Sequence, residues 1–179
     1  MERAGLTMFT TDQGLISNGE YASPPRFLFK VTRVLNMTRI NVVPVHELCD
    51  QHLLAEFREL TRIPNGILSG KLKIDYDDRP TEYTLGKGHV KFFTNKLPWL
   101  HSRYIWLHME CLYRGFVVKN IWPSGNSLGN IHHQVGYIPT FKAQSINRMR
   151  IRERWPKNAR YCGIPWPDPT TPFTFCIQD

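Results

Sequence analysis

Apolar residues recur at helical spacing in three stretches of the chain. The spacing predicts helices over about 47–61, 96–114 and 140–155. Leu53, Phe57 and Leu60 form one apolar stripe in the first of them. The pattern therefore predicts a mainly α fold, with one compact domain of about three helices and long loops.

Breakers and caps set the expected ends of these helices. The run 63–66, which contains proline and glycine, is expected to end the first helix. Pro98 suits the first turn of the second helix, where an amide has no partner to lose, and Gly115 closes it. Four prolines follow Pro156, so the tail is expected to lack regular structure.

The chain divides into three expected parts. Residues 1–36 lack sustained periodicity and are interpreted as a poorly structured extension, from an upstream start or a cleaved segment. Residues 37–156 are the expected helical domain, and residues 157–179 an irregular tail rich in proline and aromatics.

Charge and cysteine content narrow the class of protein. The sequence has 23 Lys and Arg and 15 Asp and Glu, which gives a formal net charge of +8. This charge favours binding to a polyanionic partner over a protein that is merely basic. The 4 cysteines are scattered, and neither Cys-x-x-Cys nor His-Glu-x-x-His occurs, so no metal and no cofactor are expected. No apolar run suits a membrane span, and we expect an intracellular, cytoplasmic monomer.

One strip of the first helix combines a carboxylate with cations. Successive residues of an α-helix are turned by about 100°, which places this strip on the face opposite the apolar stripe. Its members are Gln51, His52, Ala55, Arg58, Glu59 and Arg62. The strip could hold two phosphates and present Glu59 between them. The alternative is the ordinary charged outer face of an amphipathic helix.

The third helix and its exit are strongly basic. Between residues 142 and 160 only Glu153 opposes seven cations, which are Lys142, Arg148, Arg150, Arg152, Arg154, Lys157 and Arg160. Like charges one turn apart repel, so binding to nucleic-acid phosphates is favoured over a simple solvated face.

Several motifs together resemble a known family. They are Met37-Thr38-Arg39-Ile40-Asn41, Asp50-Gln51-His52-Leu53, Arg58-Glu59-Leu60, Gly88-His89-Val90, Phe92-Phe93, Glu110-Cys111-Leu112, Arg114-Gly115-Phe116 and Tyr137-Ile138-Pro139. Over about 37–155 the chain resembles the phage-type pyrimidine-dimer DNA glycosylase/AP lyase family. The resemblance implies one mainly helical domain that binds ultraviolet-damaged duplex DNA without a metal.

The resemblance also implies residue roles. Thr38 matches the family's nucleophile, whose α-amine is exposed when the initiator Met is removed, and Glu59 matches the catalytic carboxylate. The positions that match DNA-contacting or supporting residues are Arg39, Gln51, His52, Arg58, Arg62, Arg150 and, with arginine in place of lysine, Arg154.

A chain that begins at Met1 conflicts with this chemistry, because the Thr38 nitrogen is then an amide. We expect translation to start at Met37. A basic DNA-binding protein without catalysis is the main alternative if Thr38 is not a free N-terminus. A metal-dependent nuclease is disfavoured, because no carboxylate cluster lies near the arginines in sequence.

Overall fold

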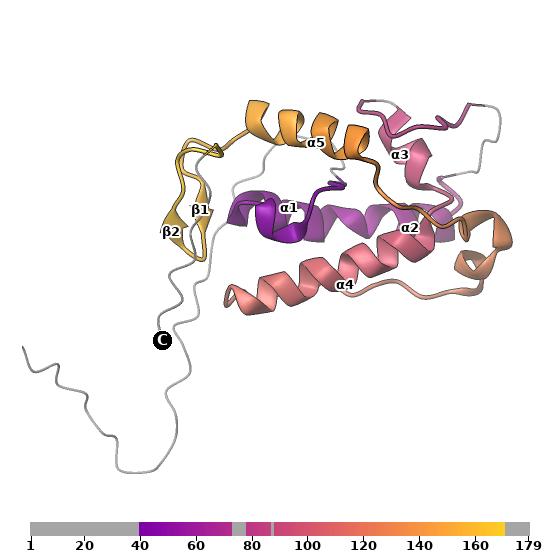
Figure 1. Ribbon diagram of the computed structural model, residues 1–179. Coiled ribbons are helices and arrows are strands. Elements are labelled where there is room, and N and C mark those ends of the chain that lie inside the picture. Colours follow the sequence, from indigo (N-terminus) through magenta and orange to yellow (C-terminus); the bar gives the residue numbers. More distant parts are fainter. Residues whose placement is uncertain (1–39, 73–77, 87, 171–179) are drawn as a thin grey trace, which may run out of the picture.

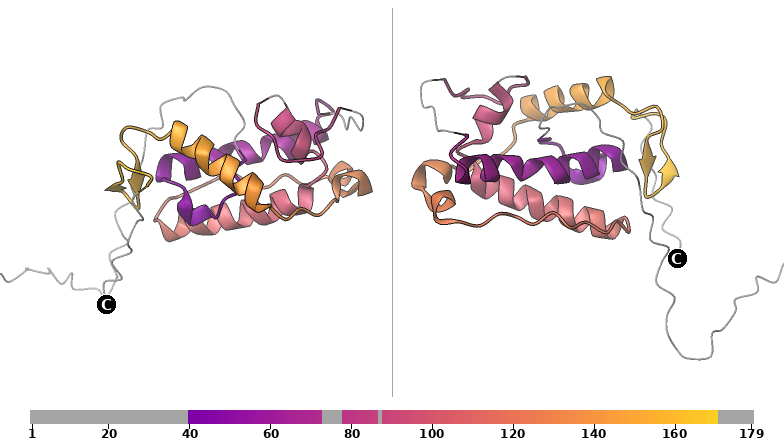
Figure 2. Two further views of the ribbon diagram at one scale, coloured as in Figure 1. Left: turned by 45° about the horizontal axis from the view of Figure 1, so that its top comes forward. Right: turned by 180° about the vertical axis from the view of Figure 1, so that it is seen from behind.

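The computed structural model describes residues 40–72, 78–86 and 88–170, and within these ranges it is a layered helical fold (Figure 1). Helix α1 (Asp50–Leu60) packs against the long helix α4 (Leu97–Tyr113). Helix α5 (Phe141–Glu153) lies on the other side of α1 in the views of Figures 1 and 2. The mainly α class predicted from the sequence is confirmed.

Two further helices were not predicted. Helix α2 (Arg62–Leu68) follows α1 after one residue, and helix α3 (Gly88–Phe93) precedes α4. The first helix ends at Leu60, close to the expected Thr61, but the expectation that residues 63–66 interrupt regular structure is wrong, because they lie within α2 with Pro64 in its first turn. In a first turn the missing amide costs no hydrogen bond within the helix.

The ends of the predicted helices shift inward by a few residues. Residues Val45–Glu47 form a short 3-10 helix, so α1 begins later than expected. The Thr140 hydroxyl caps α5 by accepting from the Ala143 amide at 3.1 Å. Gly115 follows α4 with φ 78°, a backbone conformation that glycine adopts without strain.

The core lies between the helices and is rich in aromatic rings. Leu53, Phe57 and Leu60 of α1 are buried, as the apolar stripe predicted. Phe93 stacks on Trp99 with 5.3 Å between ring centroids, and the same cluster joins α3 to the start of α4. Such aromatic contacts fix the short α3 in place.

The segment after α5 contains a regular element, contrary to expectation. Strands β1 (Arg160–Tyr161) and β2 (Ile164–Pro165) pair antiparallel, with Tyr161 opposite Ile164. The two residues between them have positive φ, as a tight hairpin turn requires. The prolines fall outside the turn, so they do not prevent this pairing.

Asp50 anchors the hairpin to the start of α1. Its carboxylate accepts from the Cys162 and Gly163 amides at 3.1 and 2.9 Å. Tyr161 and Trp166 are buried in a small cluster with Cys49 and Ala159. The segment that follows α5 is therefore attached to the helical layers by both polar and apolar contacts.

Candidate active site and nucleic-acid interface

Glu59 lies on α1 beside the cations that the sequence predicted. Its side chain is 16% exposed, and Arg62 Nη1 lies 3.9 Å from Glu59 Oε1. Arg58 is exposed, and its Nε donates to the Leu54 carbonyl at 3.3 Å. Glu59 and Arg62 are thus neighbours on α1, and Arg58 lies one residue before Glu59 on the same helix.

Gln51 and His52 contact protein backbone in this structure. Gln51 Nε2 donates to the Asn158 carbonyl at 2.6 Å, and the Arg160 amide donates to Gln51 Oε1 at 3.1 Å. His52 is buried, and its Nε2 lies 3.2 Å from the Arg154 carbonyl. The expectation that all six strip residues face outward is therefore wrong for His52, because the exit from α5 covers it.

Trp155 completes this cover. Its ring meets the His52 ring edge to face at 5.8 Å, and its Nε1 donates to the Trp166 carbonyl at 3.0 Å. The contacts of Gln51, His52 and Trp155 hold the exit of α5 against the first turns of α1. Arg154, the last capping residue of α5, is thereby fixed on the same side of the molecule as these two α1 residues.

The basic character of α5 is partly neutralised. Arg148 binds Glu47 through two hydrogen bonds of 2.7 and 2.8 Å. Arg150 pairs with Glu153 at 2.8 Å, a half-exposed pair one turn apart. The helix therefore presents fewer uncompensated cations than its sequence suggests, and the more exposed Arg150–Glu153 pair is the weaker of the two.

A buried polar network holds the chain immediately after position 39. The Asn41 backbone N–H donates to Glu56 Oε1 at 3.0 Å, and Asn41 Nδ2 donates to Glu56 Oε2 at 2.8 Å. Arg103 from α4 donates to the same oxygens at 2.9 and 3.0 Å. Asn147 from α5 accepts from the Val42 amide at 2.8 Å, so all three long helices hold this segment.

His89 of α3 provides the next contact toward the N-terminus. The Ile40 amide donates to His89 Nε2 at 3.1 Å, so this nitrogen carries no proton, and Nδ1 donates to the Thr84 carbonyl at 2.9 Å. Burial is the main cause that lowers the pKa of His89, which keeps the ring neutral. A neutral ring is required here, because a protonated ring could not accept the hydrogen bond from the Ile40 amide.

The sequence reasoning missed Glu56, Arg103 and His89 as structural residues. One signal was available for Arg103, which shares a helix face with Leu100 and Leu107. A lone cation inside an apolar stripe indicates a buried partner. Thr38 and Arg39 lie outside the described residues. No cluster of three or more His, Cys, Asp or Glu suited to a metal occurs in the described ranges.

Residues 37–124 match the family model described as pyrimidine dimer DNA glycosylase. The resemblance inferred from the motifs is confirmed over that stretch. The matched stretch contains Glu59, Arg58 and Arg62, whereas α5 with Arg150 and Arg154 follows it. No helix in the described part of the chain is long and apolar enough to cross a membrane.

Proposed function

We propose that the protein excises pyrimidine dimers from duplex DNA as a glycosylase with AP-lyase activity, using the α-amine of Thr38 as nucleophile. The family supplies the glycosylase class and the DNA substrate. The observation that supports the finer proposal is the buried network that holds residues 40–42 against His89, Asn147 and Glu56, which lies three residues before Glu59 on α1.

The network limits where the chain before it can go. Asn41 is bound to Glu56, and Glu59 follows one helical turn later, about 4.5 Å further along the axis. Thr38 precedes Asn41 by three residues, which span at most about 10 Å. The length of the chain therefore permits an amine at position 38 to reach the Glu59 carboxylate. Holding a nucleophile close to the reacting centre lowers the entropic part of the barrier.

The α-amine is suited to the chemistry. Its ordinary pKa lies about two units below that of lysine, so more of it is neutral at pH 7. The neutral nitrogen attacks C1′ of the damaged nucleotide, and the base departs with the electrons of its bond to the sugar. Loss of the amine proton and opening of the sugar ring give an imine.

Glu59 is proposed to act after this attack. Its carboxylate stabilises the positive charge that develops on the sugar. It then accepts a proton from C2′, and β-elimination expels the 3′ phosphate. Water later hydrolyses the imine and restores the amine. Arg58 and Arg62 beside Glu59 are proposed to bind flanking phosphates, together with Arg39, Arg150 and Arg154. Gln51 and His52 are proposed to support the site through the α5 exit.

Borohydride trapping on abasic duplex DNA tests the nucleophile. A chain that begins at Thr38 is expected to give a covalent adduct that maps to Thr38, whereas a chain that begins at Met1 gives little. Glu59→Gln is expected to keep DNA binding and to lose strand cleavage, and Glu47→Gln serves as the control. Equal trapping by both chains, with the adduct on a lysine, would refute the N-terminal nucleophile. DNA binding without trapping by either chain would favour the binding protein without catalysis.

A further inference from the structure

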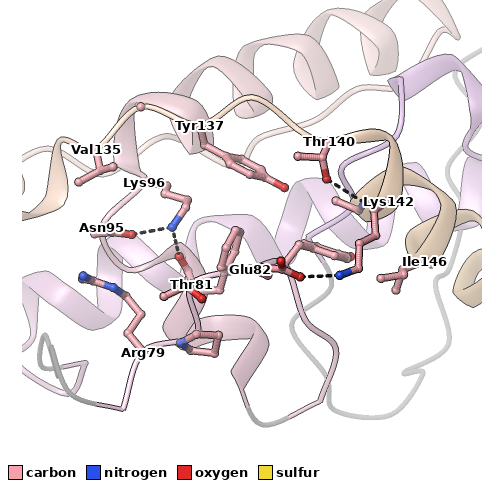
Figure 3. Close-up of a pocket in the computed structure, with 15 residues that line it drawn as sticks. Arg79, Thr81, Glu82, Asn95, Lys96, Val135, Tyr137, Thr140, Lys142 and Ile146 are labelled. Atoms are coloured by element: carbon pink, nitrogen blue, oxygen red, sulfur yellow. Dashed lines mark hydrogen bonds and ion pairs between the residues drawn. The ribbon is translucent and has the colours of Figure 1, made fainter.

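A pocket of about 650 Å³ lies between residues 79–83, helix α3 and the start of α5 (Figure 3). Pockets for small molecules commonly have about 300–1,000 Å³. Its aromatic walls are Tyr83, Phe92 and Tyr137. Among the described residues, none that is proposed for the lyase reaction lines it, and the strip on α1 contributes no residue to it.

The charged groups of the pocket leave an excess of positive charge. Lys96 is 8% exposed, and its Nζ donates to two neutral oxygens, the Phe92 carbonyl at 2.8 Å and Asn95 Oδ1 at 2.9 Å. The only carboxylate in the lining is Glu82, which pairs with Lys142 at 2.7 Å. Lys96 therefore contributes a positive charge that no carboxylate of this lining balances.

The state of Lys96 agrees with a missing counter-charge. Burial first, and then repulsion from Arg79, lowers the pKa of Lys96 to about 8. The ammonium still dominates at neutral pH, and no carboxylate in the described ranges pairs with it. A buried cation without an opposite charge is unfavourable, so an anion in the pocket would stabilise it.

Two tyrosine hydroxyls offer further donors. Tyr83 is 8% exposed, and its hydroxyl and that of Tyr137 are buried without a hydrogen-bond partner in the described part of the chain. Both tyrosines line the same pocket. Figure 3 shows the Tyr137 ring extending into the pocket. Each buried hydroxyl without a partner costs about 1–3 kcal/mol, which a ligand oxygen would recover.

We propose that this pocket binds a nucleoside 5′-monophosphate, either as the free nucleotide or at the 5′ end of a DNA strand. A phosphate monoester carries a charge of about −2 near neutral pH, so it would supply the opposite charge that Lys96 lacks. The Lys96 ammonium and the two hydroxyls donate to its oxygens, and the start of the 13-residue helix α5 adds a positive dipole end. The aromatic walls suit a planar base.

Calorimetric titration of the full chain with dAMP and with deoxyadenosine tests the phosphate requirement. We expect dAMP to bind at least about tenfold more tightly, because only it carries the charge. Lys96→Met is expected to weaken dAMP binding by about tenfold or more, and Tyr137→Phe by a smaller factor. Lys119→Met, which removes an exposed lysine elsewhere, is expected to leave binding unchanged.

Short single strands with a 5′ phosphate or a 5′ hydroxyl distinguish the two sources. Tighter binding of the phosphorylated strand that depends on Lys96 assigns the strand end, and binding of dAMP alone assigns the free nucleotide. Equal affinity for dAMP and deoxyadenosine would overturn the proposal, as would dAMP binding that Tyr137→Phe and Lys96→Met both leave intact. Tyr137→Phe removes no hydrogen bond seen among the described residues, so it tests the pocket without unfolding it. Borohydride trapping by a chain starting at Thr38 does not depend on this pocket, so the two proposals can fail separately.

Discussion

The buried carboxylate of Glu56 is expected to dominate the stability of the fold, and Glu56→Gln tests this. The pair with Arg103 is fully enclosed, with side chains 0% and 2% exposed. Replacing the carboxylate leaves the Arg103 guanidinium buried without an opposite charge, which costs about 3–5 kcal/mol. The same change also weakens the two hydrogen bonds that hold Asn41.

Glu47→Gln provides a matched control, because Glu47 also binds an arginine through two hydrogen bonds. That pair with Arg148 is about one third exposed on each side, so its loss is expected to cost at most about 1 kcal/mol. Equilibrium unfolding in urea measures both free energies. The double change Glu56→Gln with Arg103→Met is expected to recover part of the loss, because it removes the unpaired charge. Equal losses for Glu56→Gln and Glu47→Gln would refute the reasoning.

Three further predictions follow from particular contacts. The depressed pKa of His89 means that the unfolded chain binds a proton more readily, so the free energy of unfolding is expected to fall as pH drops below about 6.5. His89→Gln should flatten this dependence in urea titrations and His101→Gln should not; an unchanged slope for His89→Gln would contradict it. Arg154→Ala is expected to reduce the log–log salt dependence of DNA binding by about one unit, whereas Arg148→Ala, whose guanidinium Glu47 holds, leaves it nearly unchanged; no difference between them would move the DNA surface elsewhere. Asp50→Asn is expected to speed amide hydrogen exchange in the hairpin, because it weakens two backbone contacts, and exchange at the wild-type rate would show that the apolar contacts suffice.

The sequence predicted those helices whose apolar pattern lies within one continuous segment of the chain. The stripe of Leu53, Phe57 and Leu60 predicted α1, because repeated apolar positions on one helix face require a partner surface. The short α3 was missed because six residues carry too little periodicity, and its place depends on aromatic contacts with the segment around Trp99. The hairpin was missed because contacts that hold it involve Asp50, more than one hundred residues earlier in the chain.

In the candidate site too, local spacing predicted some positions and missed the contacts between distant segments. Helical spacing placed Glu59 beside Arg62, and the structure has them 3.9 Å apart. Spacing also put His52 on an outer face, but the exit of α5 covers it through a contact 102 residues away in sequence. Asn41 and Asn147, separated by 106 residues, hydrogen bond at 2.9 Å, and nothing local in either segment indicates this pairing. Local patterns therefore indicate candidate site residues, whereas the buried polar contacts around them depend on how the helices meet. For a nucleophile proposed only two residues before Ile40, those contacts limit the distance to Glu59, so variants of the network should slow the reaction even though they touch no DNA.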